Sequence, residues 1–357
     1  MEDYQRLASV MDTPSSDGRP KQVVVVGGGL LGTELVFSLQ RRYGSFPKKD
    51  PIPPADSSAS PSICLIQVTP DPQGLLAEML PRPLSEYVTQ QMRKIGVEIR
   101  TGYEVSSAKR SSDGRLKLML KSRQGEEQVI DDVDYVIVDA GAEPNVELAR
   151  ESGIPLDEKL GGIHADSEFR VDDTLWAAGA VCAFEDPTLR MRRRVDYMEH
   201  AEASGRFAGA NMTGAHKTCT HQSSFSMPFG KFEHMEGVGH VDVRNSDTIT
   251  YFIGDEKSDN HENENPIAVV FYLSNDDDDR RENDGARRVL GILFVNVYNS
   301  VAMLMARRIL ADARRHTPKE LRELIKVFRV FTMFEADDEE DAEKSNEERE
   351  EEKSEIR

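Results

Sequence analysis

Cysteine is scarce in this chain of 357 residues, which contains only Cys64, Cys182 and Cys219. Three cysteines without a C-x-x-C pair are too few for a structural metal cage or a disulfide framework, so a reducing compartment is the default. Long apolar runs are also missing, since no stretch reaches the roughly 18 apolar residues that span a membrane. Residues 1–22 have neither the apolar core of a signal peptide nor the Arg-rich, acid-poor character of a mitochondrial presequence, so no targeting signal is expected.

Positive charge is in deficit, with 45 Lys and Arg against 64 Asp and Glu and a net charge of −19. This negative net charge argues against a protein whose whole surface binds nucleic acid or an anionic membrane. Residues 335–357 hold 13 acidic and 4 basic residues and are expected to be a disordered, solvated tail, which leaves −10 for residues 1–334. The one dense basic run, Arg190 with residues 192–194, is either a phosphate-binding patch or a loop paired with nearby acids.

Several segments have the patterns of regular structure. The β-branched run Gln22–Val26 predicts a fully buried strand of a parallel sheet, and a helical pattern follows from Leu31 to Arg42. Residues 43–62 are rich in Pro, Ser and Asp and predict an exposed insertion. Further strands are expected at 63–68, 97–99, 103–109, 115–122, 127–130, 135–140, 175–178, 238–243, 248–253, 267–273 and 289–297, and those at 97–99, 103–109, 115–122 and 127–130 are expected to form a small meander. Helices are expected at 84–95, 198–212, 301–313 and 317–329.

A glycine-rich loop, Gly27-Gly28-Gly29-Leu30-Leu31-Gly32, fits G-x-G-x-x-G directly after a strand and at the opening of a helix. Gly27 permits the tight turn, Gly29 lets the backbone approach a pyrophosphate, and Gly32 lets the helix pack closely on the strand. The helix N-terminus then offers amide donors to phosphates. The context favours dinucleotide binding over a vestigial turn.

An acidic ribose ligand is expected at the end of the second strand of such a unit, where this chain has Asp71. A carboxylate there favours NAD(H) over NADP(H), because it would repel the 2′-phosphate. The alternative interpretation of Asp71 is a Pro-Asp-Pro turn. Glu34 is the first acid inside the helix, a place where the helix dipole favours a carboxylate.

Longer stretches resemble the apoptosis-inducing factor family of flavoprotein NADH oxidoreductases, which are built like glutathione reductase. The resemblance runs from about Asp3 to Phe334 and is most specific in GRFAGANMTGA and HQSSF. Other stretches that carry it are VVVVGGGLLGTELVFSLQRR, GAEPNVELA, LWAAGAVCAF, VVFYLSN and GILFVNVYNSVAMLMARRIL.

The resemblance implies an α/β fold with a Rossmann-like NADH domain at residues 1–140, the second half of a split FAD domain at 141–222, and an α+β C-terminal domain at 223–334. It assigns NADH contacts to a set of positions and places Glu34 beside the flavin as the catalytic carboxylate. It also implies FAD as a cofactor, a location in the mitochondrial intermembrane space with relocation to the nucleus, and import or cell-death partners, and it allows a homodimer. The implied cofactor-binding positions are Gly27, Gly28, Gly29, Leu30, Leu31, Gly32, Asp71, Gly141, Gly179, Asp196, Tyr197, Met198, Glu236 and Asn299.

The chain departs from the family at positions that matter for the flavin. The family's Gly-Asp pair, whose Asp holds the ribityl chain, is Gly179-Ala180 here, and its paired histidines are Tyr197-Met198. A stacking tryptophan corresponds to Ser226 and an NADH-contacting lysine to Glu78. The chain also starts at the link that enters the NADH domain, so the first half of the FAD domain is expected to be missing. FAD binding is therefore expected to be impaired or absent. Without a bound flavin, the hydride of NADH has no acceptor.

Two functional hypotheses remain open. The first is an NADH:acceptor oxidoreductase of the apoptosis-inducing factor type, of which this chain is a part. The second is a flavin-free NAD(H)-binding or dimerising interaction protein with no redox turnover. DNA binding, a role the resemblance suggests, is opposed by the acidic charge. The group of His216, Cys219 and His221 lacks the four ligands typical of zinc, so no metal is expected.

Overall fold

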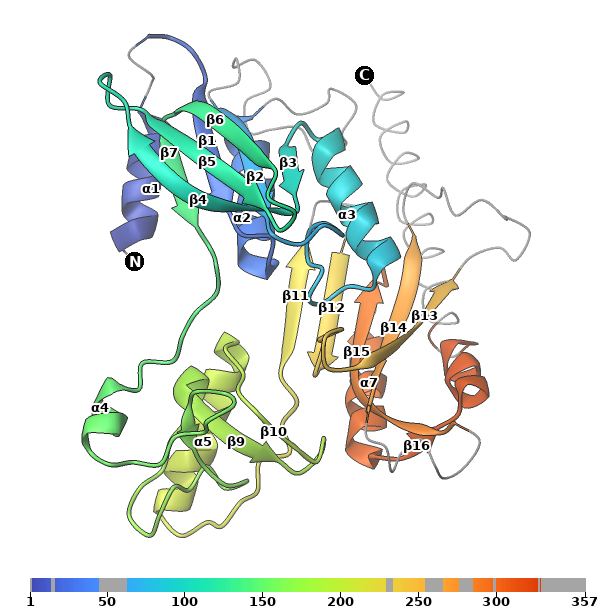
Figure 1. Ribbon diagram of the computed structural model, residues 1–357. Coiled ribbons are helices and arrows are strands. Elements are labelled where there is room, and N and C mark those ends of the chain that lie inside the picture. Colours follow the sequence, from blue (N-terminus) through green and yellow to red (C-terminus); the bar gives the residue numbers. More distant parts are fainter. Residues whose placement is uncertain are drawn as a thin grey trace, which may run out of the picture. The chain divides into compact units, whose positions relative to one another are not determined.

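The structure is a computed structural model that describes residues 2–13, 17–44, 63–228, 234–253, 266–275, 285–297, 300–326 and 328 (Figure 1). It divides into two compact units, one of Met1–Ala142, Met227–Lys231 and Asp242–Arg244 and the other of Glu143–Ser226, Phe232–Val241 and Asn245–Arg357. Most of the expected insertion at 43–62 and the acidic tail at 335–357 lie outside the described residues. Among the helices that are described, none combines the length and apolarity needed to cross a membrane.

The first unit is built around a four-stranded parallel sheet in the order β3-β2-β1-β7. β1 (Lys21–Val26) lies in its interior, between β2 (Ile63–Thr69) and β7 (Tyr135–Val138), and Val23, Val24 and Val25 are fully buried. β3 (Glu98–Thr101) forms the far edge beside β2. A strand covered on both faces needs apolar side chains at every position, which explains the uninterrupted valine run.

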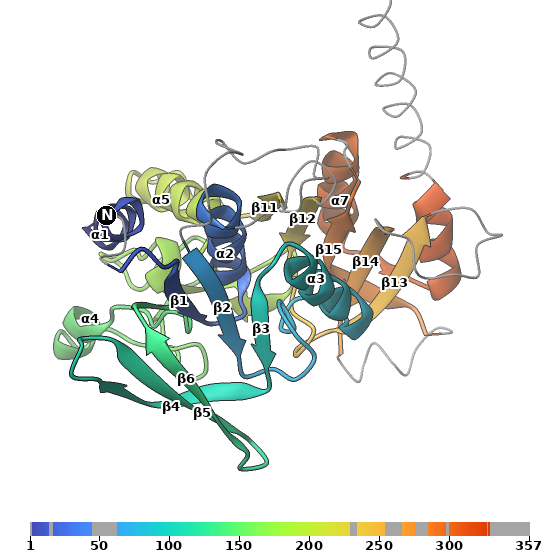
Figure 2. The same cartoon turned by 90° about the horizontal axis from the view of Figure 1, so that it is seen from above.

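Layers cover both faces of this sheet (Figure 2). α2 (Leu30–Tyr43) and α3 (Arg82–Lys94) lie on one face, and the antiparallel sheet of β4 (Tyr103–Arg110), β5 (Leu116–Ser122) and β6 (Glu127–Val133) lies on the other. Val24, Ile66 and Val68 of the parallel sheet pack against residues of the antiparallel sheet, including Leu118 and Leu120. An additional helix, α1 (Glu2–Asp12), precedes β1 and buries Leu7 and Met11.

The second unit begins with short elements. These are α4 (Glu147–Glu151), β8 (Ile163–His164), a 3₁₀ turn at Gly179–Val181, β9 (Cys182–Asp186), β10 (Met191–Arg193) and α5 (Met198–Met212). β8, β9 and β10 form a three-stranded sheet in the order β10-β9-β8. Phe169, Phe184 and Ala208 are among the residues of a small core that packs this region together.

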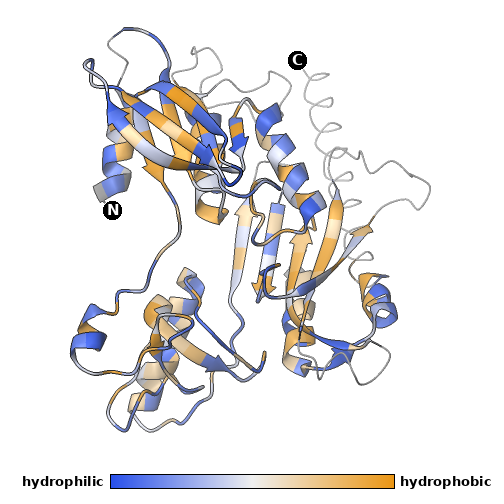
Figure 3. Ribbon diagram, viewed as in Figure 1, coloured by the Kyte–Doolittle hydropathy of each residue, from blue (hydrophilic) through white to orange (hydrophobic). Residues whose placement is uncertain are grey.

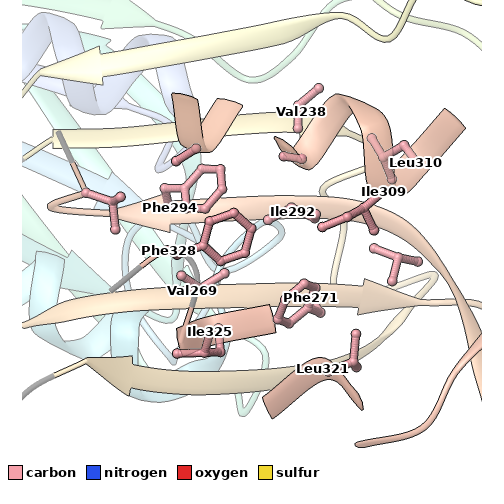
Figure 4. Packing of buried hydrophobic residues seen from close by; sticks show 14 of the residues in the cluster. Val238, Val269, Phe271, Ile292, Phe294, Ile309, Leu310, Leu321, Ile325 and Phe328 are labelled. Atoms are coloured by element: carbon pink, nitrogen blue, oxygen red, sulfur yellow. The ribbon is translucent and has the colours of Figure 1, made fainter. Parts of the chain in front are cut away.

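The chain continues into a six-stranded antiparallel sheet, all of which belongs to the second unit except Met227 and Pro228 of β11. Its order is β11 (Ser224–Pro228), β12 (His234–Gly239), β15 (Arg287–Val295), β14 (Ile267–Leu273) and β13 (Asp247–Ile253), with β16 (Arg315–His316) paired to β15. Figure 3 shows that β14 and β15 are strongly hydrophobic. α7 (Ser300–Asp312) and a helical segment at 318–326 contribute Leu310 and Leu321 to the apolar cluster shown in Figure 4.

The expected α/β fold class, with parallel and antiparallel sheets, is confirmed, but three predicted strands are wrong in detail. Residues 97–99 were assigned to the meander, whereas β3 joins the parallel sheet beside β2. Residues 175–178 form no strand, because their backbone bonds return to the segment just before them: Val171 N–H donates to the Leu175 carbonyl over 2.8 Å and Ala177 N–H donates to the Phe169 carbonyl over 2.9 Å, with only an isolated bridge between Arg170 and Trp176. The strand expected at 238–243 lies earlier, as β12. The three-domain boundaries stay predictions.

Candidate nucleotide-binding site

The glycine loop joins β1 to α2 at the carboxyl end of the parallel sheet. Gly27 has a φ of +129°, and its N–H donates to the carbonyl of Val68 over 2.8 Å. A Cβ atom at Gly27 would lie 1.8 Å from the carbonyl oxygen of Asp139, which follows β7. The turn after β1 therefore requires glycine at position 27 for two reasons, its positive φ and the close approach of the residue that follows β7.

The other three glycines of the loop differ from one another in what surrounds them. A Cβ at Gly28 would meet the hydroxyl of Thr69 at 2.4 Å, and one at Gly32 would meet the Asp139 carboxylate at 2.9 Å. Gly29, by contrast, has a φ of −77°, and apart from its own chain neighbours no described atom lies within 4 Å of an added Cβ. Packing of the protein therefore explains Gly28 and Gly32 but not Gly29.

The first turn of α2 presents backbone donors at this loop. Thr33 N–H makes the first backbone bond of the helix, to the Gly29 carbonyl over 3.1 Å. Among the described residues, no acceptor is bonded to the N–H groups of Leu30 and Leu31, the first two residues of α2. The Leu31 side chain is 64% exposed, so this end of the helix is open to a ligand. Such a terminus suits an anion, because its donors and its dipole both favour negative charge.

Hydrogen bonds from β2 and from the segment that follows it hold the loop in place. Gln67 is fully buried and donates from Nε2 to the Gly27 carbonyl over 2.8 Å. Leu76 N–H donates to the Gly28 carbonyl over 2.7 Å. Gln67 was not predicted from the sequence, although one amide within an apolar strand is a signal that a buried polar group bonds to a specific partner.

Asp71 lies two residues after β2, on the segment that leads to Leu76. Its Oδ1 accepts a hydrogen bond from Gln73 N–H over 2.8 Å, which is the geometry of the alternative turn interpretation. Within the described structure no hydrogen bond reaches its second oxygen, Oδ2. The turn and a ribose-binding role are compatible, since they use different oxygens.

Gly141 and Glu34 complete the expected residues of the first unit. Gly141 is exposed, follows β7 by three residues and has a φ of +91° with open space around it. Glu34 is half-buried on α2. The glycine loop, Asp71 and Gly141 thus follow β1, β2 and β7, three neighbouring strands whose carboxyl ends share one edge of the sheet. That edge is where ligands bind in open α/β sheets.

The remaining expected residues belong to the second unit. Gly179 opens the 3₁₀ turn with a φ of +77°, and its N–H donates to Ser204 Oγ over 2.9 Å. Tyr197 precedes α5 with its ring 5.6 Å from that of Phe225, and Met198 is 80% exposed. The other three sites are Asp196, which is exposed, Glu236, whose Oε1 lies 3.1 Å from His234 Nε2, and Asn299, which lies outside the described residues.

Other chemistry-bearing groups of the second unit are engaged elsewhere. His216 Nδ1 lies 3.3 Å from Glu168, and His221 Nε2 lies 3.3 Å from Glu199, so the two imidazoles face different carboxylates. In the part of the chain that the structure describes, no three His, Cys, Asp or Glu side chains form a group that could hold a metal. Burial raises the pKa of the Cys182 thiol to about 12, which makes it a poor nucleophile.

Comparison with known proteins agrees with this geometry. Residues 2–205 match the family described as pyridine nucleotide-disulphide oxidoreductase. Apoptosis-inducing factor 1 of Dictyostelium discoideum is 27% identical over 87% of the chain, and the putative apoptosis-inducing factor 1 of Drosophila melanogaster is 28% identical over 88%. The resemblance found in the sequence is thereby confirmed. The chain spans about half the length of these relatives, 53% and 42% respectively.

Solved structures support the same fold. A FAD-dependent pyridine nucleotide-disulphide oxidoreductase from Desulfovibrio vulgaris has a TM-score of 0.63 at 20% identity, with 93% of this chain and 74% of that chain covered. A ferredoxin reductase from Rhodopseudomonas palustris has a TM-score of 0.61 at 20% identity, with 84% and 61% covered. With more than half of its residues in the family match, the chain belongs to the pyridine nucleotide-disulphide oxidoreductase family.

Proposed function

We propose that the first unit binds NAD(H), with the diphosphate at the N-terminus of α2. The observation that supports this most directly is Gly29. The protein's own packing accounts for the other three glycines of the loop, whereas a side chain at Gly29 would point into open space beside the unbonded N–H groups of Leu30 and Leu31. A diphosphate that bonds to these groups needs the backbone of Gly29 to be bare.

The same proposal assigns the ribose to Asp71. A carboxylate at the end of β2 can accept hydrogen bonds from the two ribose hydroxyls of NADH, and it would repel the additional phosphate of NADPH. We therefore expect NADH to bind more tightly than NADPH. The remaining NADH contacts implied by the resemblance, Gly141, Asp196, Tyr197, Glu236 and Asn299, are part of this proposal.

For the whole protein we propose an NADH oxidoreductase of the apoptosis-inducing factor type, located in mitochondria and acting in programmed cell death. The names of the Dictyostelium and Drosophila relatives support this assignment. Glu34 would then lie beside the flavin. The intermembrane space, nuclear relocation, a homodimer and import or cell-death partners belong to the same proposal and can be examined by fractionation and by the mass of the purified protein.

FAD is the cofactor of this family, which couples NAD(P)H to a flavin that carries the hydride chemistry. The described residues of the second unit do not fit it well. Ala180 stands where the family has the Asp that holds the ribityl chain, and a methyl group cannot bond a hydroxyl. The Ala180 carbonyl accepts a hydrogen bond from Arg194 Nη1 over 3.1 Å instead. We therefore derive no hydride step through the flavin from this chain.

Ala180 also favours the second candidate function, a flavin-free NAD(H)-binding interaction protein. The two candidates differ in one measurement. The purified chain, incubated with FAD and passed through a desalting column, either keeps the visible absorbance of bound flavin and reduces a dye with NADH, or does neither while it still binds NADH. The first result supports the oxidoreductase and the second supports the interaction protein.

The proposed nucleotide site is tested with Gly29→Ala. Because an added Cβ meets no protein atom, this variant should keep the melting temperature of the native chain. Its affinity for NADH, measured by fluorescence titration, should fall about tenfold or more, since the Cβ excludes the diphosphate. Gly209→Ala is the matched control, because it makes the same chemical change at a helical glycine of α5 with equally open surroundings. Equal NADH affinity of Gly29→Ala and the native chain would contradict the proposal.

A further inference from the structure

Asp139 places a carboxylate at the N-terminus of α2. It follows the last residue of β7, and its backbone N–H donates to the Val26 carbonyl over 2.7 Å, as a continuation of the pairing between β7 and β1. Its Oδ2 accepts the N–H of Gly32 over 2.6 Å. Gly32 is the third residue of α2, so Asp139 already occupies one of the donors that a helix start leaves without a partner inside the helix.

The position of Asp139 coincides with the ligand-binding edge of the sheet. In the order β3-β2-β1-β7, the chain leaves β1 toward β2 on one side, and β7 lies on the other, so β1 and β7 flank the switch point of the topology. Asp139 is the first residue beyond β7 at this point (Figure 1 shows β1 and β7 side by side). Asp139 is not a member of any ion pair formed between the described residues; its carboxylate is bonded to the Gly32 N–H.

A carboxylate and a diphosphate bind to a helix N-terminus through the same groups. Both are oxygen anions that accept hydrogen bonds from backbone N–H groups and are stabilised by the positive end of the helix dipole. Two such anions close together repel each other, and this repulsion is strongest where water is partly excluded. Asp139 is half-buried, which limits the screening of its charge.

We propose that Asp139 is an intramolecular competitor of the nucleotide diphosphate, which lowers the affinity of the glycine loop for NAD(H). The proposal rests on the proposed function of the loop and adds its regulation. In the structure the Asp139 carboxylate accepts a hydrogen bond from Gly32 N–H. When a nucleotide binds, its diphosphate takes the N–H groups of Leu30 and Leu31 and must either share the helix terminus with this charge or displace it.

Two substitutions separate the charge of Asp139 from its hydrogen bond. Asp139→Asn removes the charge and keeps an oxygen that can accept from Gly32 N–H, whereas Asp139→Ala removes both. Asp131→Asn is the matched control with the same change of net charge. Asp131 lies on β6, and its carbonyl accepts from the side chain of Gln22 at the opposite, amino end of β1. Its carboxylate pairs with Lys117 over 3.0 Å at the surface.

NADH is titrated into the native chain and the three variants at two ionic strengths. At about 0.01 M, charges are screened only beyond about 30 Å, whereas at about 1 M they are screened beyond about 3 Å. Asp139→Asn and Asp139→Ala should each bind NADH about tenfold more tightly at low ionic strength, which corresponds to about 1.4 kcal/mol. The gain of Asp139→Asn should shrink at high ionic strength, and Asp131→Asn should bind like the native chain. Inorganic pyrophosphate should compete with NADH more effectively in both Asp139 variants.

Failure of this inference is distinguishable from failure of the proposed function. If the native chain binds NADH and neither Asp139 variant, shown by its melting curve to be folded, binds more tightly, Asp139 is not a competitor and the nucleotide site stands. If only the Asp139 variants bind NADH, the competition is strong and both proposals hold. If neither the native chain nor any folded variant binds NADH, the nucleotide site is wrong, and the proposed role of Asp139 is wrong with it.

Discussion

Arg193 carries its charge in the interior of the second unit, where three acceptors surround the guanidinium. Nη1 donates to Asp186 over 3.3 Å and to Gln222 over 3.2 Å, and Nη2 donates to the Gly239 carbonyl over 3.1 Å. The Arg193 side chain is 7% exposed and that of Asp186 is 1% exposed. A buried ion pair adds little net stability, but the loss of one partner is costly, because the other charge stays buried without compensation.

Arg193→Met should therefore lower the free energy of unfolding by about 3–5 kcal/mol, measured by urea denaturation. In the double variant with Asp186→Leu no charge remains buried, so its loss should be smaller than the sum of the two single losses. Additive losses would show that the two residues stabilise the unit independently.

His200 makes the stability of the second unit depend on pH. It is 1% exposed on α5, and its ring stacks on Phe184 with the ring centroids 5.0 Å apart. Burial is the largest cause and, together with the nearby charges of Arg193 and His221, lowers the pKa of His200 from 6.5 to about 4. Between these two values the unfolded chain binds a proton that the folded chain does not, so the free energy of unfolding falls as the pH falls from about 6.5 to about 4.

The contribution of His200 to this loss is about 3 kcal/mol. Burial lowers the pKa of His221 and His316 in the same direction, so the native chain alone does not isolate His200. His200→Phe keeps the aromatic stack, and His200→Gln serves if the larger ring is not accommodated. The difference in unfolding free energy between the native chain and the variant should change between pH 4 and 6.5, and a constant difference would contradict the assignment.

The sequence predicted the glycine loop because its requirements are local. A turn with positive φ after a buried strand needs glycine whatever the rest of the fold is. Asp139 and Gln67 were not predicted as parts of the loop, since their roles depend on β7 and β2 lying on either side of β1. That arrangement is a property of the sheet, and in the sequence Asp139 follows Gly32 by more than a hundred residues.

At the scale of elements, long apolar strands were predicted well and short polar ones were not. The predicted strand at 267–273 coincides with β14, whose residues from Ala268 to Leu273 are all buried. β10 consists of Met191, Arg192 and Arg193, and its arginines gave no strand pattern because they bond to partners that only the folded unit supplies. A strand of three residues is defined by its neighbour rather than by its own sequence.

The antiparallel sheet of the second unit depends on the apolar cluster beneath it (Figure 4). Phe271 of β14 is fully buried there, and its ring centroid lies 6.2 Å from that of Tyr251 on β13. Phe271→Ala should lower the free energy of unfolding by about 3–5 kcal/mol, because it removes buried apolar surface and leaves a cavity.

Phe252 on the neighbouring strand β13 is the matched control, because its side chain is 48% exposed. Phe252→Ala should cost less than about 1 kcal/mol. If both variants lost the same stability in chemical denaturation, the cluster would not be the main source of stability of this sheet.

At the scale of the whole molecule, the charge of −19 and the position of the basic run bear on DNA binding. Arg192 donates to the Ala183 carbonyl over 2.8 Å, Arg193 is buried with Asp186, and Arg194 donates to the Ala180 carbonyl. Three of the four arginines that form the dense basic run of the sequence therefore bond within the second unit. The ion pair between Arg193 and Asp186 confirms in part the interpretation that the run pairs with nearby acids.

We expect no binding of duplex DNA at physiological salt. Non-specific affinity comes from lysine and arginine side chains that neutralise phosphates and release counterions, and dissociation constants of typical binders are about 10⁻⁴ to 10⁻⁶ M. Fluorescence anisotropy of a labelled duplex should show a dissociation constant weaker than about 10⁻⁴ M at an ionic strength of about 0.15 M. Arg190→Ala, which removes the exposed arginine of the run, should change nothing. A dissociation constant of about 10⁻⁵ M that weakens steeply with added salt would instead show that a basic surface forms despite the net charge.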